Sequence, residues 1–293
     1  MNGKKQSSVL WFAPASVLLA LVVVYPILRT IVLSFIHQSL ATGFRAEFAG
    51  IDNFGRLIFD SRFRSSLWTT ALFTVVSVGL EFLIGLLLAL SAGALHRGRN
   101  AVRVILLVPW TLPTAVIALL WAWIFNDEYG VVNTILQRVG ILHSPVTWLG
   151  QPAGAIFAIV VADVWKTTPF VFLILLSGLQ NIPRELYEAI EIDGGGSWAR
   201  FRYVTWPHLA PFVFVAVIFR VIQAFAIFDL VWVMTGGGPG GATETVSIYT
   251  YQTYMRYLDF GYGAALAVAT GVILALTAAA LHKVLLRRYE ENL

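Results

Sequence analysis

Long apolar segments constrain the fold of this chain more than any other feature. Of its 293 residues, 58% are hydrophobic and 12% are charged, whereas a soluble domain carries about twice that charged fraction. Apolar runs of about 18 residues or more recur, and runs of that length cross bilayers as helices. The polar stretches reach only roughly 30 residues, too few for a sizeable soluble domain. The solvent for most of this chain is therefore lipid.

Six membrane-spanning helices are predicted from these runs. Each is longer than the roughly 20 residues that a helix needs to cross the hydrocarbon core. The first run is too long to be the core of a signal peptide, so we expect it to remain as a helix. The sequence thus predicts an all-α membrane protein with a single transmembrane domain over residues 1–293. The predicted spans cover residues 9–35, 66–94, 103–125, 153–179, 211–234 and 261–286.

The distribution of basic residues predicts the orientation in the membrane. An even number of spans places both termini on the same side. If that side is the inside, eleven Lys and Arg residues lie in the inner segments and six in the outer ones. Cytoplasmic segments generally carry this excess. We therefore expect both termini and the loop at 180–210 to be cytoplasmic.

Several kinds of chemistry lack a sequence signal. The chain has no cysteine, so it can form neither a disulfide nor a thiolate metal site. It has no G-x-x-x-x-G-K-[S/T] motif for ATP, and its five histidines are dispersed without metal-ligand spacing. No motif pairs a nucleophile with a base, and a net charge of +4 gives no nucleic-acid signal. We expect no catalytic residue, metal, cofactor or nucleic-acid partner in this chain.

The polar loop at 180–210 is typical of a short helix, a glycine turn and a second short helix. Asn181 can cap the first helix, and Pro183 suits its first turn. Three glycines at 194–196 end that helix, because glycine readily adopts positive φ. The residues alone leave two interpretations open. The loop is either an elbow on which a partner docks or an ordinary amphipathic segment lying on the lipid headgroups.

The spacing within this loop resembles a known motif. It resembles the EAA loop of binding-protein-dependent ATP-binding-cassette (ABC) permeases. The matching positions are Glu188-Ala189, then Asp193-Gly194, and then Pro207 at a fixed distance. In that family the loop is a coupling helix that fits a cleft on a separate ATPase subunit. The resemblance implies that the ATPase-coupling residues are Glu188, Ala189, Asp193, Gly194, Gly195 and Pro207.

Three positions depart from the family pattern. Ile190 stands where a second Ala is usual, Gly195 where Ala is common, and Trp206 where Leu is usual. The first two departures change the side-chain bulk at the docking face. They leave the backbone turn itself intact.

The resemblance extends over the whole chain to the larger-type permease of carbohydrate uptake systems, similar to trehalose, maltose and glycerol-phosphate importers. The chain is similar to these permeases in the number of spans and in the segments Phe48–Phe54, Val164–Phe170 and Met234–Pro239. The family implies a type I importer fold in the bacterial inner membrane. It also implies a second homologous permease, an ATPase dimer that binds ATP and Mg, and an extracytoplasmic solute-binding protein as partners.

Six ionisable residues fall inside the predicted spans, where charges are costly and should face the bundle interior or a wet cavity. Mutual pairing is one explanation, and Asp163 with Lys166 is suited to it at i, i+3. Arg220 is expected to form a structural ion pair with a neighbouring helix. The other explanation is that some of these residues line the solute path. The six are Arg29, Glu81, Asp163, Lys166, Arg220 and Asp229.

Sugars are bound by carboxylates, amides and flat aromatic faces, so we take as candidates for the solute path Asp163, Trp165, Gln223, Asp229 and Trp232. The predicted function is a non-catalytic permease subunit of an ATP-driven importer of a di- or oligosaccharide such as trehalose or maltose. An ion-coupled secondary carrier is an alternative function, because Glu81 can serve as a proton site. Glycerol phosphate is an alternative substrate, because Lys166 and Arg220 can bind an anion. No ring of polar residues supports a passive channel.

Overall fold

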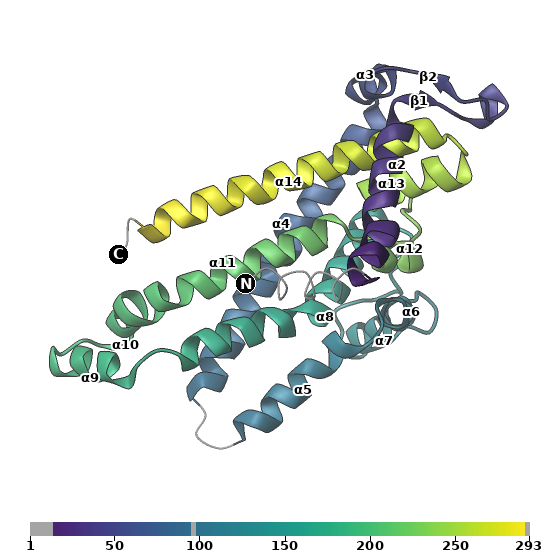
Figure 1. Cartoon of the computed structure of the whole chain (residues 1–293). Helices are drawn as coiled ribbons and strands as arrows, with labels where there is room; N and C mark the ends of the chain where they lie inside the picture. The colour runs from purple at the N-terminus through teal and green to yellow at the C-terminus, as the bar shows by residue number, and fades with distance from the viewer. Residues whose placement is uncertain (1–13, 95–97, 291–293) are drawn as a thin grey trace, which may run out of the picture. The chain divides into compact units, whose positions relative to one another are not determined.

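The computed structural model describes residues 14–94 and 98–290 and is mainly helical (Figure 1). Its contacts divide the chain into two compact units. Unit 1 comprises residues 1–63 and 249–273, and unit 2 comprises residues 64–248 and 274–293. The sequence predicts one domain and contains no linker that would mark this division.

Unit 1 begins with a helical span over Pro14–Ser34 that includes the π-helical turn η1 (Ala20–Val24) and α2 (Tyr25–Ser34). A small antiparallel hairpin follows, in which Ile36 of β1 lies opposite Phe48 of β2. The remaining elements that begin in this unit are η2 (Leu40–Thr42), α3 (Asp52–Phe59), the start of α4 (Ser61–Ala94), η4 (Gln252–Arg256) and the start of α14 (Phe260–Glu290), and the strands are β1 (Ile36–His37) and β2 (Glu47–Phe48).

Unit 2 is built around α8, which packs against α5, α6, α11 and α12. Its core consists of two apolar clusters, one containing Ala158, Ile159 and Leu230, the other Phe172, Leu175 and Leu209. The further helices are α5 (Arg99–Thr111), α6 (Thr114–Ile124), α7 (Val131–Arg138), α8 (Pro152–Gln180), α9 (Arg184–Ile192), α10 (Ser197–Ala199), η3 (Arg200–Thr205), α11 (Trp206–Phe225), α12 (Asp229–Met234) and α13 (Val246–Tyr251).

Within the described residues, five helices are long and apolar enough to cross a membrane, and a bent pair makes a sixth candidate. The pair, Ala101–Thr111 and Thr114–Ile124, is bent by 91°. It takes the place of the single third span predicted over 103–125. The physical reason is Pro113, because the residue before a proline is driven out of the helical region. Leu112 accordingly has an extended ψ of 144°. The five helices that are each long enough to cross a membrane are Pro14–Ser34, Ser61–Gly93, Pro152–Gln180, Ser197–Phe225 and Phe260–Val284.

The predicted fifth span, 211–234, is displaced toward the N-terminus. Its helix is continuous over Ser197–Phe225 and ends there, and Asp229–Met234 form the separate short helix α12. The π-helical turn Arg200–Thr205 carries the chain into α11 without a break, and Pro207 lies in the first turn of that helix. Most of the predicted apolar run is helical, but hydropathy does not show where a helix within the run ends.

Candidate functional site

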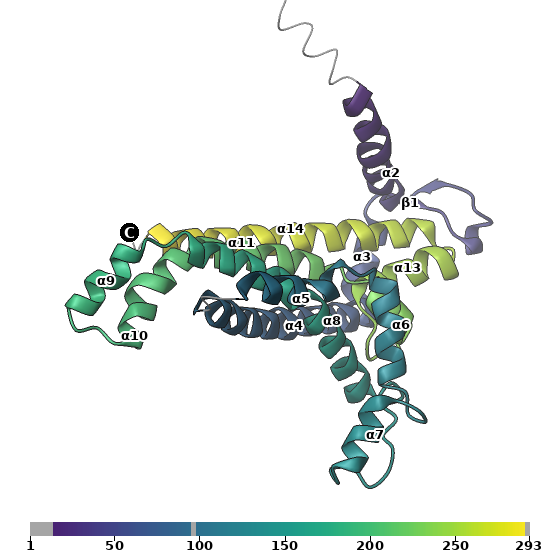
Figure 2. The same ribbon diagram turned by 90° about the horizontal axis from the view of Figure 1, so that it is seen from below.

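Residues 184–205 form a folded elbow between α8 and α11, called here the coupling elbow. Figures 1 and 2 both show α9 and α10 beyond the ends of α8 and α11. The elbow has the predicted helix–turn–helix order, but one detail of the prediction is wrong. Pro183 occupies the N-cap position of α9, whereas Asn181 is the C-cap residue of α8.

A Schellman motif ends α9. Gly194 has a φ of +75°, the left-handed conformation that glycine adopts without steric cost. Its N–H donates to the carbonyl of Glu191 at 3.1 Å, and the Gly195 N–H donates to the carbonyl of Ile190 at 2.8 Å. These two bonds satisfy carbonyls that the helix end would leave unpaired. The D-G pair of the motif therefore fixes the sharp turn of the elbow.

Gly195 is required by the size of Ile190. A Cβ atom placed on Gly195 would lie 2.5 Å from Ile190 Cγ2, 3.0 Å from the Ile190 carbonyl oxygen and 3.2 Å from Ala199 Cβ. These are the two positions at which the chain departs from the family pattern of alanines. The two departures compensate each other, because the larger side chain at 190 occupies the space that an alanine at 195 would need.

Side-chain contacts hold the two arms of the coupling elbow together. Arg200 Nη2 donates to Glu191 Oε1 at 2.8 Å, and the Tyr187 hydroxyl lies 3.0 Å from Thr205 Oγ1. Thr205 is buried, so the second contact ties α9 to the start of α11. The elbow is thus a folded unit and not a loose loop.

The outer surface of the elbow carries most of the predicted coupling residues. Glu188, Ala189, Asp193 and Gly194 are exposed, whereas Gly195 is half-buried within the turn. Pro207 is half-buried in α11 and shapes the junction with that helix. Large apolar side chains are exposed beside them: Ile192 (85%), Trp198 (73%) and Tyr203 (72%). Such a surface is suited to docking.

Unit 2 also contains a buried charge cluster. Arg220 of α11 donates from Nη2 to Glu81 Oε1 of α4 at 2.8 Å and to Asp163 Oδ2 of α8 at 3.0 Å. A further bond joins Arg220 Nε to Glu81 Oε2. Arg220 Nη1 donates to Gln223 Oε1 at 2.9 Å. All three charged side chains are at least nine-tenths buried, so the cluster links three helices inside the unit.

The geometry corrects two expectations and confirms one. Asp163 forms its ion pair with Arg220 of another helix, so the local pairing expected with Lys166 is not the contact that neutralises it. Glu81 is engaged by Arg220 and is not an isolated carboxylate. The structural ion pair predicted for Arg220 with a neighbouring helix is confirmed.

The structure brings together only two of the five candidates for the solute path. Asp163 and Gln223 both contact Arg220. Trp165, two residues further along α8, is 40% exposed and packs edge-on against Trp121, with ring centroids 5.7 Å apart. The other two candidates lie on α12. Asp229 is exposed in its first turn, and the Trp232 ring stacks on Phe228 at 5.8 Å.

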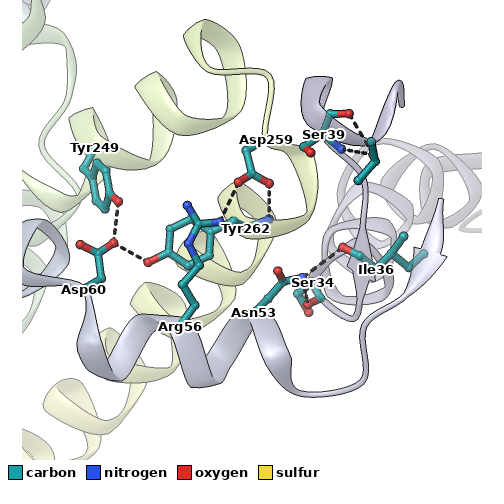
Figure 3. Close-up of polar contacts among 10 residues, drawn as sticks. Ser34, Ile36, Ser39, Asn53, Arg56, Asp60, Tyr249, Asp259 and Tyr262 are labelled. Carbon is teal, nitrogen blue, oxygen red and sulfur yellow. Dashed lines mark hydrogen bonds and ion pairs between the residues drawn. The ribbon is translucent and has the colours of Figure 1, made fainter. Parts of the chain in front are cut away.

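A polar cluster in unit 1 has no counterpart in the sequence prediction (Figure 3). The Asp60 carboxylate accepts hydrogen bonds from the Tyr249 hydroxyl at 2.6 Å and from the Tyr262 hydroxyl. Partial burial would raise the pKa of Asp60, but these bonds and backbone N–H groups outweigh it and lower that pKa below its usual 3.8. Burial and the Asp60 hydrogen bond raise the pKa of Tyr249 to about 12. Nothing in the sequence signals the cluster, because Asp60 is 189 residues from Tyr249 and 202 residues from Tyr262.

In the part of the chain that the structure describes, no three His, Asp or Glu side chains are grouped so that they could hold a metal ion. The coupling elbow and the charge cluster are therefore the two features with functional geometry. One offers a docking surface, and the other is a buried set of ion pairs that joins α4, α8 and α11.

The sequence is similar to those of known transport proteins. Residues 81–291 match the family described as binding-protein-dependent transport system inner membrane component. The sulfoquinovosyl glycerol transport system permease protein SmoG of Agrobacterium fabrum is 43% identical, over 91% of this chain and 86% of that protein. The trehalose/maltose transport system permease protein MalF of Thermococcus litoralis is 41% identical, over 90% and 88%. The trehalose transport system permease protein SugA of Mycobacterium tuberculosis is 35% identical, over 87% and 81%.

Solved structures share the fold. A chain of a bacterial ABC transporter that imports the acidic polysaccharide alginate superposes with a TM-score of 0.82 at 21% identity, over 97% of this chain and 96% of that one. A chain of a bacterial alginate ABC transporter in complex with an alginate pentasaccharide-bound periplasmic protein gives a TM-score of 0.81 at 20% identity, over 95% of this chain and 93% of that one. The predicted all-α, type I importer permease fold is confirmed. The chain belongs to the family of binding-protein-dependent transport system inner membrane components and is a permease subunit of an ABC importer.

Proposed function

We propose that this permease carries a di- or oligosaccharide of the trehalose or maltose type, and that partner ATPases drive it through the coupling elbow. Two of the relatives described above are named for trehalose or trehalose/maltose transport and a third for sulfoquinovosyl glycerol transport. The observation that carries the mechanism is the rigid elbow, whose exposed surface presents Glu188, Ala189 and Asp193.

The elbow can transmit force because it is continuous with a long helix. The helix runs without a break from Ser197 to Phe225 and carries Arg220 and Gln223. Arg220 lies about 21 Å along the axis from Trp206. Closure of the ATPases would displace the elbow, tilt this helix and move Arg220 against its partners on α4 and α8. The ATPases then shift the population between inward- and outward-facing states by binding one of them more tightly.

The charge cluster favours a neutral sugar over glycerol phosphate. Arg220 is already shared by two carboxylates, Glu81 and Asp163, so it is not available to an anion. The bond from Arg220 to Gln223 Oε1 orients the amide and leaves its Nε2 group to donate to a sugar hydroxyl. The engagement of Glu81 by Arg220 also weakens the case for an ion-coupled carrier, since that carrier needs a carboxyl group that takes up and releases protons.

The proposal includes the remaining partners that are usual in this family. An ATPase dimer binds ATP and Mg, a second homologous permease completes the membrane domain, and an extracytoplasmic solute-binding protein delivers the sugar. This chain itself is non-catalytic. Both termini and the 180–210 loop are cytoplasmic, which places the coupling elbow on the side where the ATPases hydrolyse ATP.

Uptake into proteoliposomes tests the proposal. The chain is reconstituted with its sister permease, ATPases and binding protein, and uptake of labelled trehalose, maltose and glycerol 3-phosphate is measured with and without ATP. We expect ATP-dependent uptake of a disaccharide and none of the phosphate ester. Uptake driven by a pH gradient without ATPases would show a secondary carrier, and uptake of glycerol 3-phosphate alone would overturn the substrate class.

A further inference from the structure

An apolar strip on α3 faces away from the rest of unit 1. Ile51, Ile58 and Phe59 are 74%, 68% and 83% exposed, and Phe48 of β2 is 85% exposed. Ile51 and Ile58 are seven residues apart and lie on one side of the helix, with Gly55 between them. Four large apolar side chains exposed together mark a surface that something covers.

The opposite side of α3 is firmly anchored (Figure 3). Asn53 Nδ2 donates to the carbonyls of Ser34 and Ile36, each at 3.0 Å. Arg56 Nη1 pairs with Asp259 Oδ2 at 2.9 Å, and the Arg56 guanidinium lies 4.0 Å from the centre of the Tyr262 ring. Leu57, on the same side of the helix, is buried. Rotating α3 to hide Ile58 would break all of these contacts, so the apolar strip stays outward.

The anchors also connect α3 to the ends of candidate membrane spans. Asn53 bonds to Ser34, the last residue of the first candidate span. Arg56 bonds to Asp259, one residue before the span that begins at Phe260. Phe59 lies two residues before Ser61, where another span begins. The helix is therefore tied to the ends of three candidate membrane spans.

We propose that α3 is an interfacial helix whose strip of Ile51, Ile58 and Phe59, extended by Phe48, is seated in the lipid bilayer at the boundary between headgroups and acyl chains. An amphipathic helix at this level buries its apolar side roughly 5–10 Å into the boundary. Lipid is the occupant that the position of α3 favours, because all three nearest span ends border the bilayer. The proposal needs only membrane insertion and does not depend on the solute.

The absence of cysteine from the chain allows a direct test. Ile58→Cys and Phe59→Cys are made as separate single-cysteine variants and labelled with an environment-sensitive fluorophore in lipid nanodiscs. Ala46→Cys is the matched control, because Ala46 is also exposed and lies in the loop between β1 and β2. Quenching is measured with lipids that carry a nitroxide at a shallow acyl position and with iodide in water.

We expect the shallow lipid quencher to act about threefold more strongly at positions 58 and 59 than at 46, and iodide to show the reverse order. A second permease or binding protein over the strip would instead hide the label from both quenchers once the complex is assembled. That result, or equal quenching at all three positions, would overturn the proposal. Two independent positions keep the test decisive if one variant fails to insert.

Discussion

Replacing Gly195 by Ala should damage the coupling elbow through one steric overlap. Gly195 does not have a positive φ, so alanine can adopt its backbone conformation. The added Cβ, however, would lie 2.5 Å from Ile190 Cγ2, closer than real Cβ atoms approach. Overpacking of this kind costs about 1–3 kcal/mol. Because the Ile190 carbonyl accepts the Gly195 N–H, the strain falls on the Schellman turn itself.

The Ile190→Ala replacement should relieve most of that cost. It removes Cγ2 and leaves the contact of 3.0 Å with the Ile190 carbonyl oxygen, which a small backbone shift can accommodate. The double variant should therefore be more stable locally than the sum of the single variants, with a coupling of about 1–2 kcal/mol. It would also restore alanine at both positions where the family usually has it.

Hydrogen exchange of the amides in residues 184–199, followed by mass spectrometry, measures the local free energy of opening for the four proteins in the cycle. ATP-dependent uptake is recorded beside it. Gly195→Ala should exchange faster and transport less, and the double variant should recover both. Additive effects, or wild-type exchange in Gly195→Ala, would refute the steric argument.

Three further predictions concern other parts of the molecule. Arg220→Leu leaves Glu81 and Asp163 buried without a counter-charge and should cost about 3–5 kcal/mol; thermal unfolding in detergent checks it, and an unchanged midpoint would contradict the buried ion pairs. Gly194→Pro should abolish uptake while the protein still inserts at normal levels, because proline fixes φ near −65° and Gly194 needs +75°; normal uptake argues against the elbow as the coupling element. Asp60→Asn should lower stability at neutral pH. Because folding lowers the pKa of Asp60, its contribution is present above pH about 4 and is lost as pH falls through the folded pKa, so the stability of the wild type should approach that of the variant as the pH falls below about 4; a constant difference would contradict it.

The spans and the elbow were predictable because each follows from a local pattern. Apolar runs of sufficient length specify membrane helices, and a glycine after Asp193 specifies a helix end. The end of the helix within the fifth apolar run was not found, because hydropathy averages over a window of residues and does not mark a single stop. Pro113 was nevertheless a readable signal, since it restricts Leu112 before it.

The sequence did not predict which residues contact each other within the polar clusters. The sequence identified Glu81, Asp163 and Arg220 as charges that must be shielded from lipid. It predicted that Arg220 pairs with a neighbouring helix but did not identify the partner, and the one specific pair that it named was Asp163 with Lys166. The actual contacts join residues 57 and 139 positions apart. Which helices lie side by side depends on tertiary packing, and a single sequence does not contain that information. The same holds for Asp60 and its two tyrosines.

Cross-linking from Ala189 tests the central claim that the coupling elbow docks on an ATPase. A single Ala189→Cys variant carries a short cross-linker in inside-out vesicles that contain the assembled transporter. Ala189 is exposed on α9, and its replacement leaves Glu188 in place. We predict a cross-link to the ATPase subunit whose yield changes when ATP binds. Labelling of this position only from the outer side of the membrane, or no cross-link in an active transporter, would contradict the account.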